Sequence, residues 1–146
     1  MQAIETLKAK GQVKLELTRA DGTVETVDIK NLVVTTGLNY IVSRMKDTTQ
    51  TAMSHMAIGS GSTAASAGNT ALGTELGRVA LTSTTVSTNT IQYVASFPAG
   101  TGTGTVYEAG IFNASSAGTL LCRTVFGIVT KDAGDSLAIT WTITVS

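Results

Sequence analysis

The side chains able to perform acid–base, nucleophilic or metal chemistry are few in this sequence and far apart. His55 is the only histidine and Cys122 the only cysteine, so a thiol–imidazole pair would need the fold to bring these two together. No cluster of His, Cys and carboxylates has the spacing of metal ligands, and no G-x-S-x-G motif marks a serine nucleophile. We therefore interpret His55 as structural and Cys122 as a small apolar core residue, and expect neither a cofactor nor enzymatic activity.

Four charged residues stand out because the middle of the chain contains few others. Glu75 and Glu108 would be the candidates for a paired-carboxylate site of the glycosidase kind. Buried carboxylates normally require partners, however, and Arg78 and Arg123 lie in the same part of the sequence. We expect Glu75 or Glu108 to pair with Arg78 or Arg123, within one copy or between copies, in a structural ion-pair network at the edge of the fold.

The segment Gly59-Ser60-Gly61 begins like a dinucleotide-binding loop. The third glycine of that motif would fall at position 64, which is alanine, and no helix follows with the spacing of a βαβ unit. Residues 59–68 are small and polar throughout, so we predict a mobile surface loop there.

Charge and composition exclude several classes of partner. The chain has 146 residues, the length of one domain, and only 14% of them are charged, with ten basic and ten acidic residues. A neutral, weakly charged surface predicts no binding to nucleic acid or to an anionic membrane, and it favours self-association. No stretch approaches the roughly 20 apolar residues of a membrane span. The N-terminus lacks an apolar run like that of a signal peptide, and the single cysteine excludes an internal disulfide, so we expect synthesis in a cytoplasm.

The elements that position these residues are mainly strands. In the last segment, residues 137–145, every second side chain is apolar, which predicts a half-buried strand. It carries the only tryptophan, and we expect Trp141, Ile139 and Phe112 to anchor the core. Further strands are expected near residues 53–58, 78–84, 89–97, 106–112 and 120–129.

Near the N-terminus the pattern predicts a hairpin. A three-residue loop, Ala20-Asp21-Gly22 with a left-handed glycine, pairs Val13 with Ile29 and Leu15 with Val27, which keeps the apolar side chains on one face.

After the hairpin the period changes from strand to helix. The spacing of Leu38, Ile41, Val42 and Met45 predicts a helix over residues 36–46 that buries this face. A second helical turn is predicted over residues 70–78. Many short strands, Gly-rich turns and one helix indicate a mostly β, antiparallel sandwich of jelly-roll or immunoglobulin-like kind. We expect a single domain, 1–146, with an N-terminal arm and hairpin in 1–34 and the main sandwich in 35–146.

From residue 35 onward the order of segments resembles the attachment domain of tail-collar fibre proteins of tailed bacteriophages. There the segments "A-x-G-x-G", "T-x-L-x-x-E-x-x-R", "E-A-G-[IL]-F" and a closing Thr-rich strand follow one another. The corresponding segments of this chain are Met56 to Gly61, Asn69 to Arg78, Ile91 to Phe97, Tyr107 to Asn113, Leu121 to Phe126 and Ile139 to Ile143.

The resemblance implies a non-enzymatic structural protein of the virion, made in the host cytoplasm. In fibre proteins a shaft and a receptor-binding tip follow the domain, whereas here the sequence stops at Ser146. This difference favours a capsid decoration or cement protein over a tail-fibre or collar adaptor. The expected partners are further copies of the chain, in a dimer or trimer, and the major capsid protein or other virion proteins. The N-terminal hairpin lies outside the resemblance and is a candidate arm for contacting a neighbour.

A carbohydrate-binding module is the alternative from another class, since jelly rolls often act as lectins. Aromatic residues make up only 5% of the chain. Most lie on expected strands, which leaves Tyr40 and Tyr107 as candidate sugar-stacking residues.

Overall fold

The computed structural model describes residues 6–46 and 50–146. In this part of the chain there are nine strands and one helix. In chain order they are β1 (Ala9–Thr18), β2 (Val24–Val33), α1 (Thr35–Arg44), β3 (His55–Gly59), β4 (Glu75–Ala80), β5 (Ser83–Ser87), β6 (Thr90–Phe97), β7 (Gly104–Phe112), β8 (Leu120–Lys131) and β9 (Ser136–Val145).

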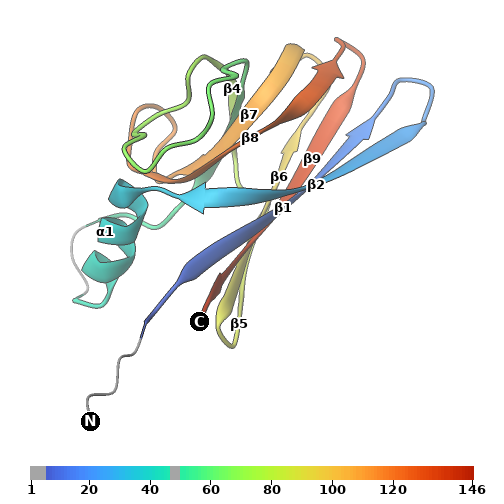
Figure 1. Cartoon of the computed structure of the whole chain (residues 1–146). Helices are drawn as coiled ribbons and strands as arrows, with labels where there is room; N and C mark the ends of the chain where they lie inside the picture. The colour runs from blue at the N-terminus through green and yellow to red at the C-terminus, as the bar shows by residue number, and fades with distance from the viewer. Residues whose placement is uncertain (1–5, 47–49) are drawn as a thin grey trace.

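The strands form one curled antiparallel sheet in the order β4-β3-β7-β8-β2-β1-β9-β6-β5 (Figure 1). The two ends of this order meet where β4 leads into β5. There Leu81 N donates to Ser54 O at 2.9 Å, and Thr82 N donates to Val94 O at 2.7 Å. The mostly β, antiparallel fold with one helix is confirmed, whereas the jelly-roll or immunoglobulin-like sandwich stays a prediction.

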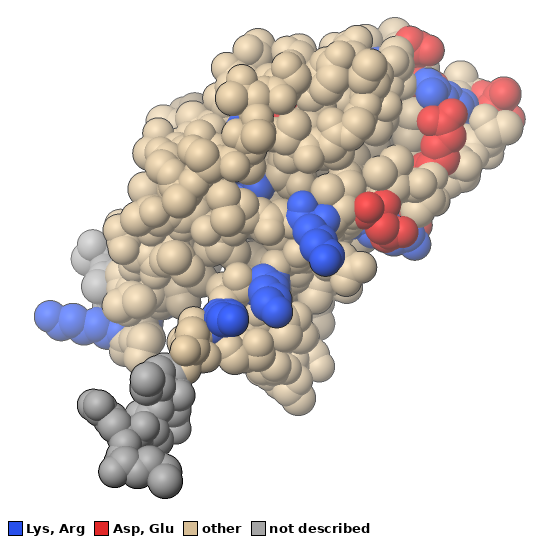
Figure 2. Space-filling model, viewed as in Figure 1, with Lys and Arg blue, Asp and Glu red and all other residues tan. Residues whose placement is uncertain are grey.

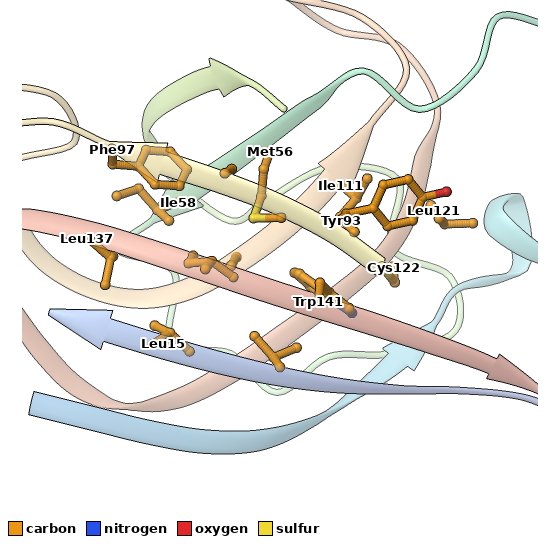
Figure 3. Close-up of a cluster of buried hydrophobic side chains, with 14 of the residues drawn as sticks. Leu15, Met56, Ile58, Tyr93, Phe97, Ile111, Leu121, Cys122, Leu137 and Trp141 are labelled. Atoms are coloured by element: carbon orange, nitrogen blue, oxygen red, sulfur yellow. The ribbon is translucent and has the colours of Figure 1, made fainter. Parts of the chain in front are cut away.

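Strand β9 lies within the sheet, and only its apolar face is buried inside the curl, as its alternating pattern predicts. It pairs with β1 on one side and β6 on the other over most of its length. Leu137, Ile139 and Trp141 are fully buried, and Ile143 nearly so. Figure 3 shows Trp141 within a cluster to which side chains of β3, β6, β7 and β8 contribute. Phe112 is also buried, but it belongs to a smaller cluster with Leu120. Burial of these side chains supplies the main driving force for folding.

The predicted hairpin register is confirmed. Val13 pairs with Ile29 and Leu15 with Val27. Gly22 has φ of +89°, and its N–H donates to Arg19 O at 2.9 Å, as in a type I turn followed by a glycine bulge. Strand β1 also pairs with β9 along its whole length, so the hairpin is built into the sheet and is not a separate arm.

The helix spans residues 35–44, and the prediction of its buried face is wrong for three of its four residues. Leu38, Val42 and Met45 are 46%, 64% and 85% exposed, whereas Ile41 is partly buried and packs against the core. Gly37 and Tyr40 are the buried residues of the helix. Gly37 lies so close to the backbone of Leu121 that a β-carbon would overlap it. The helix therefore packs on β8 through its smallest residue, because close backbone approach is possible only there.

The predicted helical turn over residues 70–78 is also wrong. Residues 70–74 form an irregular loop, and β4 begins at Glu75. The N–H groups of Gly73 and Thr74 donate to the carboxylate of Glu108, so they are not available for helical hydrogen bonds.

Candidate functional site

Glu108, on β7, lies buried beneath the loop that joins β3 to β4. Its Oε1 accepts hydrogen bonds from Gly61 N at 2.8 Å and Thr74 N at 2.9 Å. Its Oε2 accepts from Gly73 N at 2.9 Å and from Arg123 Nε at 2.8 Å. A carboxylate has about four lone-pair sites, so every acceptor site of this side chain is used.

Arg123, on the neighbouring strand β8, completes the arrangement. Besides its bond to Glu108, Nη1 donates to Asn69 Oδ1 and Nη2 to Thr63 O, each at 3.0 Å. The guanidinium and the carboxylate together hold the β3–β4 loop at both of its ends and near its middle. The predicted loop at residues 59–68 lies mostly at the surface, although Gly59 belongs to β3, and buried charged groups anchor its backbone at Gly61 and Thr63.

The two glycines at the start of this loop are required by the close approach of Glu108. A β-carbon at Gly61 would overlap Glu108 Oε1 and lie 2.8 Å from Gly73 Cα. A β-carbon at Gly59 would overlap Thr74 O and lie 2.6 Å from the same carboxylate oxygen. The glycines of the "A-x-G-x-G" segment thus leave room for the Glu108 carboxylate, and the segment does not have the form of a phosphate-binding loop.

The surroundings of Glu108 favour its ionised form. Burial by itself would raise the pKa of the carboxyl group. The N–H donors of Thr74, Gly73 and Gly61 and the guanidinium of Arg123 outweigh this effect and hold the pKa below its ordinary value. Because the carboxylate is fully buried and all its lone pairs are occupied, it is poorly placed to take a proton from a substrate.

Glu75 and Arg78 form a second ion pair, at the surface end of β4. Arg78 Nε and Nη2 donate to the two oxygens of Glu75 at 2.7 and 2.9 Å. Nη1 of Arg78 donates to Ala114 O and Ala117 O, and its guanidinium stacks 3.8 Å from the ring centre of Phe112. Glu75 and Arg78 therefore fix the β7–β8 turn. Among the described residues, no salt bridge joins this pair to Glu108 and Arg123, so the four charged groups form two pairs rather than one network.

His55 and Cys122 are on opposite faces of the sheet. Met56 pairs with Ile111, and Ile111 with Cys122, so these three side chains share the inner face and His55 points outward. His55 Nδ1 lies 2.8 Å from Ser54 Oγ. The thiol of Cys122 is fully buried, and burial raises its pKa well above the ordinary value. The structure does not bring the only imidazole to the only thiol.

Sequence reasoning missed a third charged cluster, at the β8–β9 turn. Asp135 is 3% exposed and accepts hydrogen bonds from Asp132 N, Arg19 Nη1 and Ala20 N. Those donors, the N–H of Asp132 foremost, lower its pKa. Lys131 is fully buried, and its Nζ donates to Pro98 O at 2.9 Å. The signal available in the sequence was Asp132-Ala133-Gly134-Asp135, a turn motif with a side chain that can bond to its own backbone.

Within residues 6–46 and 50–146 there is no group of three or more His, Cys, Asp or Glu side chains that could hold a metal ion. None of the helical structure in those ranges is long and apolar enough to cross a membrane.

Comparison with known proteins gives no assignment. No family model, no curated protein and no solved structure matches this chain.

Proposed function

We propose that this chain is a non-enzymatic structural protein of a tailed-bacteriophage virion, which docks on the particle surface as a homo-oligomer. The observation that supports the proposal is the convergence of the resembling segments. Gly61, Thr74, Glu108 and Arg123 come from four different segments, and all are in contact around one carboxylate. The residues that carry the resemblance thus form one structural unit.

The way the charged groups are used also supports a structural role. Glu108 and Arg123 hold a surface loop, and Glu75 and Arg78 hold a turn. Each of the four side chains is occupied by bonds within the chain. Such interactions make a rigid surface, which suits a docking protein because little conformational entropy is lost on binding.

Within this proposal we assign the chain to capsid decoration, with a tail-fibre or collar adaptor as the alternative that the resemblance favours. A decoration protein acts by mass action: many copies bind the assembled shell and not its free subunits, and so stabilise the shell. The fold would then be a β-sandwich whose polar, Thr-rich outer faces form flat interfaces.

The copy number per particle tests both statements, and quantitative mass spectrometry of purified virions measures it. A number close to that of the major shell protein supports decoration. A number of about six to eighteen, which closed symmetry at the tail would require, supports the collar or fibre adaptor. Absence of the chain from the particles would overturn the proposal as a whole.

The carbohydrate-binding alternative receives little support from the aromatic side chains. Sugar sites need exposed rings, but no tryptophan, tyrosine or phenylalanine in the described ranges is exposed, and Tyr40 is among the buried ones. Tyr107 is half-buried. Glycan-array binding that is lost in Tyr107→Ala would restore this alternative in place of the docking role.

A further inference from the structure

A groove runs along the outer face of the sheet at the N-terminal end of β1. It has a volume of about 840 Å³ and lies between β1, β2 and the start of α1. Lys8, Lys10 and Lys30 line it, with Asp28 as the only acidic residue in its wall. None of the three lysines forms a salt bridge with another described residue.

The same groove has an apolar rim. Leu7 is 77% exposed, Leu32 37% and Leu38 46%, and all three line the groove. Exposed leucines beside unpaired lysines predict a binding partner that is both apolar and acidic.

The opposite end of the same hairpin is both apolar and acidic. At the β1–β2 turn Val24 is 58% exposed, and Asp21 and Glu25 flank it in the exposed part of the chain. Arg19 lies between these acidic groups: it pairs with Glu25 at 3.2 Å and with the buried Asp135 at 2.9 Å, and it lies 3.8 Å from the exposed Asp132. This end of the hairpin therefore has four carboxylates around one arginine. Figure 2 shows acidic side chains gathered at this end, at upper right, and basic side chains without acidic neighbours nearer the N-terminal end of β1.

We propose that the β1–β2 turn of one copy docks into the lysine-lined groove of a second copy. Val24 would lie against the exposed leucines, and Asp21 and Glu25 would face Lys10 and Lys30. The turn cannot reach the groove of its own chain, because β1 is a continuous strand of ten residues, about 30 Å long, between the two.

This contact is head-to-tail, since it joins two different surfaces. Repetition closes into a ring or continues as an open chain, depending on the rotation between neighbouring copies. Ion pairs between exposed groups are screened by salt, so the association weakens as ionic strength rises. The inference rests on the surfaces described and does not depend on the proposed virion role.

Charge exchange between the two surfaces tests the inference. The double variants K10E/K30E and D21K/E25K reverse the groove and the turn respectively, and light scattering after size-exclusion chromatography reports the mass of each. We expect the native chain to associate at about 0.02 M salt and to dissociate at about 0.5 M. Each variant alone should remain monomeric, and an equimolar mixture of the two should associate again, because each then offers a complementary surface to the other.

Two further variants serve as controls. R44E/K46E makes the same change in net charge as K10E/K30E but outside the groove, and should associate like the native chain. D21N/E25Q keeps the hydrogen-bonding oxygens of the turn and removes its charge, with the loss of only the exposed Arg19–Glu25 ion pair, so it should weaken association while Arg19 remains held by Asp135. A native chain that stays monomeric at low salt and high concentration would overturn the inference. Association that the charge variants leave unchanged, or failure of the mixture to restore it, would overturn it as well.

Discussion

Glu108→Gln isolates the role of the buried ion pair. The amide has almost the shape of the carboxylate, but in either orientation its NH₂ group would face two N–H donors that now bond to a carboxylate oxygen. Arg123, whose side chain is only 3% exposed, would keep its charge without a counter-ion. Removing one partner of a buried pair costs about 3–5 kcal/mol, so we expect a loss of about 4 kcal/mol in the free energy of unfolding.

Arg123→Met should also be strongly destabilising, by about 3–5 kcal/mol, because it leaves the buried Glu108 carboxylate without a counter-ion. The carboxylate would still accept three backbone N–H bonds, from Gly61, Gly73 and Thr74. The bonds of Arg123 to Asn69 Oδ1 and Thr63 O would be lost as well. The double variant should cost less than the sum of the two, because no unpaired charge remains in the interior. Glu75→Gln is the matched control: the Glu75 side chain is 37% exposed, and Arg78, 8% exposed, keeps its bonds to Ala114 O and Ala117 O, so we expect a cost of about 1 kcal/mol.

Equilibrium unfolding in urea, followed by the fluorescence of the single buried Trp141, measures these differences. Amide hydrogen exchange at Gly61, Gly73 and Thr74 gives a second readout, since these groups should lose protection while the amides of β1 and β9 keep theirs. If Glu108→Gln does not fold in water, Arg123→Met still gives the free energy of unfolding that is lost when the buried ion pair is broken. The reasoning is refuted if Glu108→Gln and Glu75→Gln cost the same within about 1 kcal/mol, the usual size of an exposed pair.

Three further predictions follow from the geometry. Gly61→Ala should destabilise the chain by about 1–3 kcal/mol, because its β-carbon meets the Glu108 carboxylate, whereas Gly68→Ala, with no atom within 4 Å, should be nearly neutral in the same urea assay. Folding lowers the pKa of Glu108 and of Asp135, so the unfolded chain binds protons before the folded chain does as the pH falls. The free energy of unfolding, measured in urea, should therefore be full above about pH 5. It should decline as the pH falls through the ordinary carboxyl pKa values of 4.5 and 3.8. A steeper loss above pH 6 would contradict this account. The buried thiol of Cys122 should resist Ellman's reagent in the folded protein and react at once in urea; rapid reaction of the native chain would show that its environment is open.

The sequence alone predicts those features whose cause is local. The two-residue period of residues 137–145 depends only on the alternation of side chains along an extended chain, and β9 lies where it predicts. The register of the β1–β2 hairpin follows from a short turn with one left-handed glycine, so the residue pairing could be predicted from the sequence. The need of buried carboxylates for cationic partners is likewise a general rule, and it identified the right four residues for ion pairing.

The tertiary structure decided everything that depends on contacts between distant segments. The carboxylate of Glu108 bonds to N–H groups 34, 35 and 47 positions away, and these bonds turn a glycine-rich segment into an anchored loop and prevent a helical turn before β4. Leu38 and Val42 face outward because Gly37 alone permits close approach to β8, which no periodicity within the helix reveals. Local pattern determines how a segment is built, but its neighbours in space determine which of its faces is buried and which of its polar groups are used.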